Sequence, residues 1–332
     1  MGRRLERLLT YAAAAALIAS LMPLGARYGW AFDLAANFRV QYVVVDVLLA
    51  IAFVIQRKHI WCLALAACAV LSAWPVLPYV ALRIDAVAAT PTSQHTIKIL
   101  SANVLFENHS AKRLLEIVRE ESPDIVLLVE YTPEWAAQVD ELRSAYPYRL
   151  EGPIKSPWGI ALFSRLPFDS SKAIPVGPSY GVQASVRTPD GPLMLIGTHL
   201  ASPTTPWRAG VRNSQLDSLA TRVARVSGPL VVVGDLNITP YSPLFQDWLA
   251  RTGLTDTRRG RTLSPSWPVQ LPIVGVPIDH CVVSHDVVIV RHRRLPAFGS
   301  DHYPILAELA LVPPAPPEPA PPADKDKGAV PE

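Results

Sequence analysis

The first quarter of the chain differs from the rest in its pattern of hydrophobic and polar positions, because its apolar residues come in long runs. The runs cover residues 8–25, 40–55 and 60–82. A membrane-spanning helix needs about 20 mainly apolar residues, so the third run fits best. The first run is rich in weakly hydrophobic alanine, and the second is short and contains Asp46. We therefore predict that residues 1–85 form a membrane anchor with three transmembrane helices.

Charged residues beside these runs predict how the anchor is oriented. Arg3, Arg4 and Arg7 precede the first run, and Arg57 and Lys58 separate the second run from the third. Basic flanks stay mostly on the cytoplasmic side, so three crossings would leave everything after the third run outside the cytoplasm. Two alternatives remain open. The first run could be a cleaved signal peptide, or the three runs could be core helices of a soluble domain.

After a linker at 86–95, the pattern changes to short apolar stretches separated by polar turns. Strands are predicted at 96–104, 124–130, 158–165, 181–188, 192–200, 229–235, 278–284, 287–292 and 303–311. Helices are predicted at 111–121, with Ser110 as the N-cap, at 209–226 and at 242–252. Consecutive strands mixed with helices indicate a mixed α/β domain over 96–311. The Pro-rich segment 312–332 is predicted to be disordered or polyproline-like.

Composition changes this picture little, but it limits the function. The chain has 332 residues, a mean hydropathy of +0.22 and a formal net charge of +3. Residues 90–311 hold 21 Lys or Arg and 20 Asp or Glu, so the domain lacks the basic excess that marks many nucleic-acid-binding proteins. Its single cysteine, Cys281, excludes a disulfide framework within the domain.

Polar residues suited to metal or phosphate chemistry follow most of the predicted strands. They are Asn103, Glu130, His199, Asp235, Asn237, Asp279, Asp301 and His302. Asp235 and Asn237 are two residues apart, so they would project from the same face of a strand, and Gly234 allows a close approach to the backbone. Taken alone, this pair could equally begin a turn. Together, the residues predict a composite site whose carboxylates suit Mg²⁺ or Mn²⁺ and whose histidines suit proton transfer.

Seven motifs occur in the order found in one known superfamily. They are ILSANV, DIVLLVE, GIALFSR, IGTHL, VVVGDLN, IDHCVVS and GSDHYPI. Over about residues 95–311, the chain resembles the endonuclease/exonuclease/phosphatase superfamily with the deoxyribonuclease I-like fold. The resemblance implies a four-layer α/β sandwich, with two packed mixed sheets flanked by helices and the site at one rim. The N-terminal runs resemble those of bacterial members that are anchored in the inner membrane as multi-pass proteins with a periplasmic catalytic domain.

The resemblance also implies which residues bind metal and phosphate. Glu130 resembles the main Mg²⁺ ligand, with Asn103 beside it and Asp301 in the same metal-binding set. His199 resembles the histidine that contacts the scissile phosphate or protonates the leaving group, and Asn237 resembles a phosphate-binding residue. Mg²⁺ is the expected cofactor, and Mn²⁺ is possible.

The resemblance also implies that residues at the remaining strand ends take part in proton transfer. Asp235 resembles the residue that orients the attacking water, and Asp279 resembles the carboxylate that orients His302. Whether Asp235 or His302 is the base stays open at this point. Many nuclease members carry an acidic residue two positions after the first Asn, where this chain has Leu105. The departure makes a second metal site near Asn103 doubtful, and Asn108 could supply a polar group there or belong to a loop.

The sequence does not name the substrate, because one fold serves many. We expect a membrane lipid or a lipid-linked phosphate, since the domain is nearly neutral and its tether is short. An extracytoplasmic nuclease acting on DNA or RNA is the first alternative. A cytoplasmic nuclease and a non-catalytic protein that binds an envelope component are further ones. Trp158 and Trp207 could enter the membrane interface or pack in loops. No oligomeric state is predicted.

Overall fold

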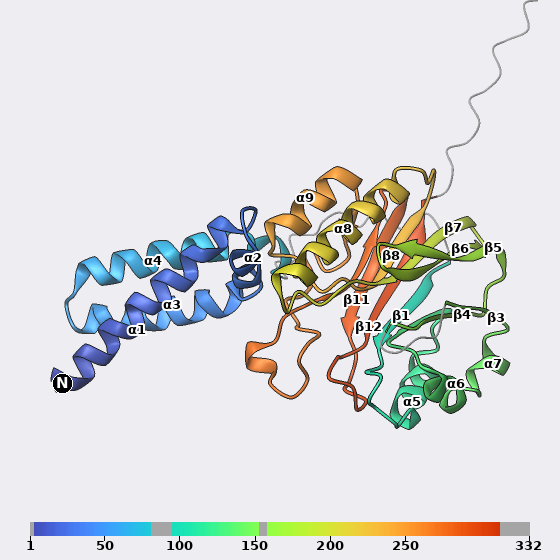
Figure 1. Cartoon of the computed structure of the whole chain (residues 1–332), viewed down its shortest axis with the longest axis horizontal. Helices are drawn as coiled ribbons and strands as arrows, with labels where there is room; N and C mark the ends of the chain where they lie inside the picture. The colour runs from blue at the N-terminus through green and yellow to red at the C-terminus, as the bar shows by residue number, and fades with distance from the viewer. Residues whose placement is uncertain (1–2, 81–94, 153–157, 313–332) are drawn as a thin grey trace, which may run out of the picture.

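The computed structural model describes residues 3–80, 95–152 and 158–312 (Figure 1). It contains an elongated N-terminal helical part, here called the bundle, and a larger α/β part, here called the sandwich. The predicted linker, apart from residue 95, and the predicted Pro-rich tail beyond residue 312 lie outside the described residues.

Three long helices of the bundle run side by side. The helical segments are α1 (Arg3–Leu21), η1 (Met22–Gly25), α2 (Trp30–Ala36), α3 (Arg39–Ile55), α4 (His59–Ala73) and η2 (Leu77–Tyr79). The three long helices, α1, α3 and α4, meet around a small core of Ala13, Ala50, Phe53 and Leu65. Most of their other large apolar side chains are exposed; Leu48, for example, is 62% exposed and Leu63 is 69% exposed. A soluble protein rarely exposes so continuous an apolar surface.

The prediction of three transmembrane helices is wrong for the described residues. One helix, Arg4–Gly25, is long and apolar enough to cross a membrane, and only 17% of its apolar window is buried. α2 and α3 would count as one span only if their 70° bend is ignored. The third run fitted best by length, yet α4 has 15 residues. α4 ends at Ala73, two residues before Pro75, because proline has no N–H to continue the helical hydrogen bonds.

The sandwich is built from two six-stranded sheets. The first sheet has the order β11 (Val287–Arg294), β12 (Ile305–Leu311), β1 (Ile97–Asn103), β2 (Ile125–Val129), β4 (Ile160–Ser164) and β3 (Tyr148–Glu151). The second has the order β5 (Phe168–Val176), β6 (Ser179–Thr188), β7 (Gly191–His199), β8 (Leu230–Asp235), β10 (Asp279–Val283) and β9 (Thr255–Asp256). Both are mixed sheets, because β1–β2 and β7–β8 pair in parallel while their other neighbours pair antiparallel.

Helices cover the outer face of each sheet, which gives the four layers that the sequence predicts. Against the first sheet lie α5 (Lys112–Glu121), α6 (Pro133–Gln138) and α7 (Leu142–Ala145); against the second lie α8 (Pro206–Val223) and α9 (Pro243–Thr252). The facing surfaces of the two sheets share one hydrophobic core, which includes Leu127, Leu195 and Val233. A short turn, η3 (Pro272–Val274), lies in the loop before β10.

Local differences from the predicted elements have simple causes. α5 begins after Ala111 and has no side-chain cap, so the assignment of Ser110 as its N-cap is wrong. α8 begins three residues earlier than predicted, because Thr205 caps it by accepting a hydrogen bond from the Arg208 amide. β5 was not predicted, since it lies at a sheet edge and most of its side chains are exposed, which removes the apolar alternation that marks a half-buried strand.

Strand register brings the chemistry-bearing residues to one rim. Asp235, the last residue of β8, pairs with His199 on β7 and with Asp279 on β10. In the first sheet, the end of β1 at Asn103 lies opposite the end of β2, so Glu130 follows directly beside it. Gly234 fits as predicted: its φ is +137°, and a Cβ there would lie 1.9 Å from the Thr198 carbonyl oxygen.

Candidate active site

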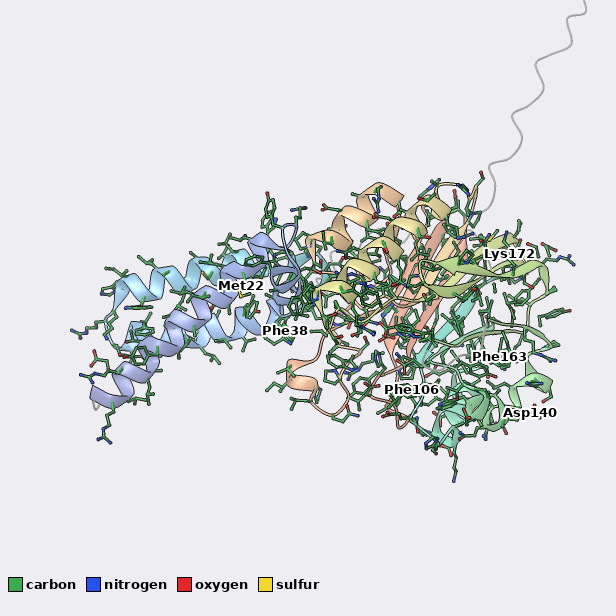
Figure 2. All side chains as sticks on the ribbon, viewed as in Figure 1. Met22, Phe38, Phe106, Asp140, Phe163 and Lys172 are labelled. Carbon is green, nitrogen blue, oxygen red and sulfur yellow. The ribbon has the colours of Figure 1, made fainter. Side chains whose placement is uncertain are left out.

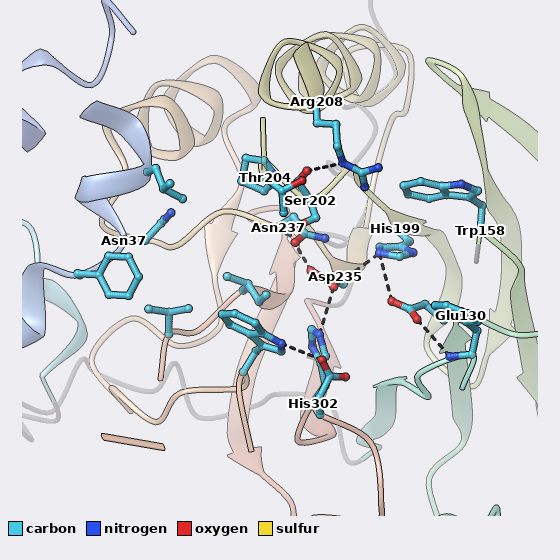
Figure 3. Close-up of a pocket in the computed structure, with 18 residues that line it drawn as sticks. Asn37, Glu130, Trp158, His199, Ser202, Thr204, Arg208, Asp235, Asn237 and His302 are labelled. Atoms are coloured by element: carbon cyan, nitrogen blue, oxygen red, sulfur yellow. Dashed lines mark hydrogen bonds and ion pairs between the residues drawn. The ribbon is translucent and has the colours of Figure 1, made fainter. Parts of the chain in front are cut away.

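The rim forms one wall of a cavity of about 560 Å³ (Figure 3). Of the eight predicted site residues, six line it: Glu130, His199, Asp235, Asn237, Asp301 and His302. Asn103 and Asp279 are buried directly behind this layer and hydrogen bond to its members. The structure thus brings all eight residues into one neighbourhood.

Asn103 joins the two sheets at the site. Its amide nitrogen donates to Glu130 Oε1 at 2.9 Å and to Asp235 Oδ2 at 3.2 Å. The other Glu130 oxygen accepts from the Phe106 amide at 3.2 Å. Glu130 has a φ of +60°, a conformation that few non-glycine residues adopt. Burial raises the pKa of Glu130, and the hydrogen bonds from Asn103 and Phe106 oppose this.

Asp235 and Asn237 form a turn whose side chains are held in place. The Asn237 amide donates to Asp235 Oδ1 at 2.9 Å, and the Asn237 side chain donates to the Leu200 carbonyl at the same distance. Asn237 also has a positive φ, +50°. Burial and the charge of Asp279 raise the pKa of Asp235. The pair therefore begins a turn and faces the cavity as well, so the two interpretations of the sequence are compatible.

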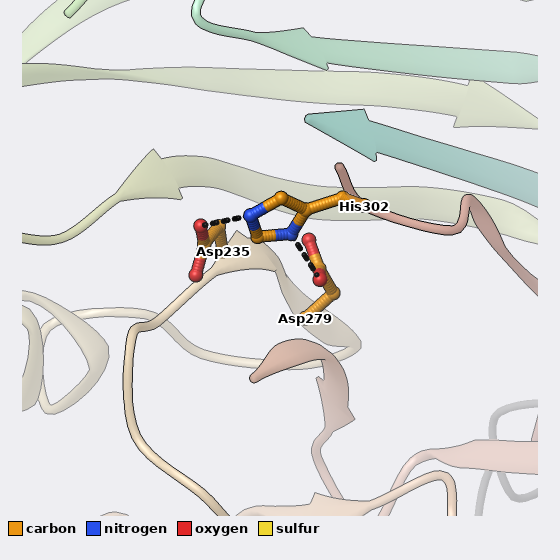
Figure 4. A group of neighbouring side chains, drawn as sticks. All are labelled: Asp235, Asp279 and His302. Carbon is orange, nitrogen blue, oxygen red and sulfur yellow. Dashed lines mark hydrogen bonds and ion pairs between the residues drawn. The ribbon is translucent and has the colours of Figure 1, made fainter. Parts of the chain in front are cut away.

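His302 lies between two carboxylates (Figure 4). Its Nδ1 is 2.8 Å from Asp279 Oδ2, and its Nε2 is 3.8 Å from Asp235 Oδ2. Burial alone would lower the pKa of His302, but the charge of Asp279, its hydrogen bond and the charge of Asp235 outweigh burial and raise the pKa to about 10. The Ser266 hydroxyl accepts from the Asp279 amide and helps to hold that end of β10. The arrangement orients the ring and keeps a proton on it.

His199 is the second histidine of the site. Its Nε2 lies 3.7 Å from Asp235 Oδ2 and 4.0 Å from Glu130 Oε1. Burial, and then the positive charge of His302, lower the pKa of His199 to about 4, so its ring is neutral at pH 7. Its Nδ1 is buried without a hydrogen-bond partner among the described residues. An unpartnered buried nitrogen is costly, which indicates that a ligand or water completes the site.

Two tryptophans and an arginine also line the cavity, and sequence reasoning did not place them there. Trp158 packs on His199 with ring centroids 5.4 Å apart, and the Arg208 guanidinium lies 5.4 Å from the Trp158 ring centre. Trp267 Nε1 donates to Asp301 Oδ2 at 2.9 Å. Trp158 therefore lines the site, whereas Trp207 is 74% exposed.

The donor set fits a hard divalent cation. Glu130, Asp235 and Asp301 face one cavity, and a bound cation would offset their mutual repulsion; oxygen donors of this kind suit Mg²⁺ or Mn²⁺. Asp235, Asp279 and His302 also place ligand atoms within 4.8 Å of one another. Both ring nitrogens of His302 already face carboxylates, however, so this group suits proton transfer better. Asn108 stays in its loop, bonding Val104 and Ser110, and is not part of the cavity lining.

Comparisons with known proteins agree with this geometry. The model of the endonuclease/exonuclease/phosphatase family matches residues 100–302. No curated protein matches. Among solved structures, an endonuclease/exonuclease/phosphatase from Beutenbergia cavernae has 21% identity and a TM-score of 0.54, covering 66% of this chain and 72% of that one.

Two further structures share the fold at low identity. D. rerio TDP2, solved with a single-strand DNA product, has 18% identity and a TM-score of 0.55, covering 64% of this chain and 98% of that one. The human nocturnin catalytic domain with bound sulfate has 19% identity and a TM-score of 0.53, covering 65% and 93%. Because the family model covers more than half of the chain and all eight site residues, the chain belongs to the endonuclease/exonuclease/phosphatase family.

Proposed function

We propose that the protein is a divalent-metal-dependent phosphoesterase attached to a membrane, acting on a membrane lipid or a lipid-linked phosphate. The observation that carries the enzymatic part is the Asp279–His302–Asp235 row, which lies beside Glu130 through their shared contact with Asn103. Members of the family hydrolyse phosphoester bonds and are generally metal dependent. A bound Mg²⁺ would polarise a phosphate oxygen and offset the charge that develops in the transition state.

Each residue of the site then has a proposed role. Glu130 and Asp301, which line the cavity, would hold the cation, with Asn103 behind them bonding to Glu130. Asp235 takes the proton from the attacking water, and His302, which is protonated and lies 3.8 Å from Asp235, stabilises the negative charge that forms. Asp279 fixes the orientation of the His302 ring.

Two uncharged side chains would contact the oxygens of the reacting phosphate. His199 and Asn237 face the phosphate oxygens, where hydrogen bonds strengthen as negative charge accumulates.

The membrane part of the proposal rests on the bundle. One exposed apolar helix, Arg4–Gly25, could cross a bilayer, and Arg3, Arg4 and Arg7 precede its apolar centre. With these arginines in the cytoplasm, a single crossing places the sandwich on the extracytoplasmic side, at the bacterial inner membrane. A substrate in that membrane is the nearest one available to the site.

The first experiment measures product release by purified full-length protein in detergent with Mg²⁺. A phospholipid, a lipid-linked pyrophosphate and a DNA duplex are offered in parallel, each with an EDTA control and a Glu130→Ala control. Metal-dependent turnover of a lipid substrate supports the proposal. Turnover of DNA alone would make the protein a nuclease, and no turnover of any substrate would contradict the enzymatic assignment.

The side of the membrane is tested separately, with a reporter fused after residue 312. Activity of a reporter that works only in the periplasm supports the proposed orientation. Activity of one that works only in the cytoplasm contradicts it.

A further inference from the structure

The cavity at the active site has a wall that does not come from the sandwich. Leu34, Asn37 and Phe38 of the bundle line the same cavity as Glu130 and His302. Asn37 lies across the cavity from Glu130 (Figure 3), and Phe38 lies where the bundle meets the sandwich (Figure 2). The sequence match to the family covers residues 100–302, so this wall comes from a part of the chain that lies outside the family match.

Buried polar contacts hold this wall against the sandwich. Asp33 accepts from Arg212 Nη2 at 2.5 Å and from Ser242 Oγ at 2.6 Å, and all three residues are buried. Asn37 Oδ1 accepts from the amide and the hydroxyl of Thr239, at 3.2 and 3.0 Å. Buried charges and amides persist only when they are paired, so these contacts define one docked arrangement.

Further contacts tie the same segment to two loops that contribute to the cavity lining. Trp30 Nε1 donates to the Pro203 carbonyl at 2.6 Å, and Gln41 Nε2 donates to the carbonyl of Gly275, the residue before the lining residue Val276, at 2.9 Å. The bundle segment is therefore bonded to both of these loops.

The cavity lining includes both polar and apolar residues. The catalytic residues and Arg208 offer the polar groups that would bind a phosphate. The apolar part, here Leu34, Phe38, Val276 and Ile278, offers no hydrogen bond from its side chains. A small anionic substrate would leave this apolar surface in contact with water, whereas an apolar chain would cover it.

An exposed apolar loop adjoins the apolar part. Leu271 is 54% exposed and Ile273 is 80% exposed, a few residues before Val276. This loop projects from the sandwich on the side of the bundle (Figure 1), whose apolar side chains are exposed as well. Apolar surface of this kind suits contact with a lipid layer.

We propose that the cavity binds a phosphoester with a long hydrocarbon chain, and that Leu34 and Phe38 contact this chain and make the enzyme prefer such substrates. The inference rests on the proposed function, and it adds that substrate selection lies in the N-terminal bundle. A nucleic acid suits the cavity less well, because Arg208 is the single Lys or Arg among the described lining residues and tracking a polyanion needs several.

The test compares pairs of substrates that share a head group and differ in chain length. One pair is dihexanoyl and dioleoyl phosphatidylglycerol, and the other is dimethylallyl and undecaprenyl pyrophosphate, so the two pairs distinguish a glycerolipid from a polyprenyl source. Full-length wild type, Phe38→Ala and Leu34→Ala are assayed in mixed micelles of one detergent. Phe32→Ala is the matched control, because Phe32 also lies in this region but packs near Gly25 and Gly29 and does not line the cavity.

For the preferred head group, Phe38→Ala should lower the ratio of kcat/KM for the long chain to kcat/KM for the short chain by about tenfold, the effect of exposing part of one large apolar contact. Leu34→Ala should lower the ratio several-fold, and Phe32→Ala should leave it unchanged. Thermal unfolding checks that each variant is folded. An unchanged ratio in both cavity variants would overturn the inference.

Binding of the long-chain compounds is also measured in EDTA, where turnover is not needed. Weaker binding by Phe38→Ala than by Phe32→Ala supports the chain-binding site even if wild type hydrolyses neither pair, and then only the proposed activity fails. Equal binding by both variants counts against the site, whatever the activity.

Discussion

At the scale of single residues, the site holds several carboxylates close together, and no lysine is among the described residues that line the cavity. Asp235 Oδ2 lies 3.8 Å from His302 Nε2 and 3.7 Å from His199 Nε2. Only His302, however, is held in its charged form. The difference arises from Asp279, which contacts one histidine and not the other. Two imidazoles in one cavity can therefore serve different purposes, one as a proton carrier and one as a neutral donor or acceptor.

Removal of the central residues should abolish hydrolysis without unfolding the protein. Glu130→Ala, Asp235→Ala and His302→Ala should each lower kcat by about a hundredfold or more, measured at matched Mg²⁺ on the preferred substrate. Glu134→Ala, which changes an exposed carboxylate on α6, should have no effect. Full turnover in any of the three site variants would remove that residue from the proposed mechanism.

The Asp279–His302 pair predicts a pH-dependent stability. Because the fold raises the pKa of His302 to about 10, the pair contributes fully below about pH 6.5, the ordinary histidine value, and its contribution declines as pH rises toward about 10. In EDTA, Asp279→Asn should therefore unfold at a lower temperature than wild type near pH 6, and the gap should narrow toward pH 10. A gap that is constant or widens with pH would contradict a protonated His302.

The polar site residues near strand ends could be predicted from the sequence, because each lies at or beside a strand that is buried and apolar on both faces. Arg208 and Phe38 could not be recognised in this way. Arg208 lies in the first turn of α8 and reaches the site only because α8 packs across the second sheet, and Phe38 reaches it only because the bundle docks there. Their roles depend on contacts between distant parts of the chain, which a local pattern does not contain.

At the scale of elements, the parallel pairing of β7 with β8 sets the position of His199 beside Asp235. The strands approach so closely at Gly234 that no side chain fits there. Central strands of this kind were predictable, since they read as continuous apolar runs. The edge strands β3 and β5 were not predictable in this way. The length of α4 was overestimated, because Pro75 lies inside the third apolar run and the helix ends before it.

Gly234→Ala tests this close approach. The new Cβ would lie 1.9 Å from the Thr198 carbonyl oxygen at a φ of +137°, so we expect a loss of stability on the order of 3 kcal/mol or more. Gly210→Ala is the control, because a Cβ there meets nothing within 4 Å and alanine favours the α8 helix by about 0.5–1 kcal/mol. Thermal unfolding of both variants in one detergent measures the contrast; equal melting temperatures would contradict the register.

At the scale of the whole molecule, the bundle and the sandwich are joined by two ion pairs of different character. Arg212–Asp33 is buried, whereas both partners of Arg27–Asp247 are more than half exposed. A buried charge that loses its partner is costly, and an exposed pair contributes little.

Arg212→Ala should therefore cost about 3–5 kcal/mol and loosen the docking, while Arg27→Ala should cost less than about 1 kcal/mol. Thermal unfolding gives the stabilities. Limited proteolysis between the two parts reports the docking. Equal effects of the two substitutions would mean that the buried pair does not hold the bundle in place.

A cavity wall supplied by the bundle also fixes how the enzyme would meet its substrate. Leu34 and Phe38 lie next to the apolar helices of the bundle. With those helices in a membrane, as proposed, the site would stay at a constant height above the membrane surface. Encounters with a lipid substrate would then depend on diffusion within the plane of the membrane. The rate should follow the mole fraction of substrate in the membrane, and diluting the vesicles in buffer at a fixed lipid composition should leave the turnover per enzyme unchanged.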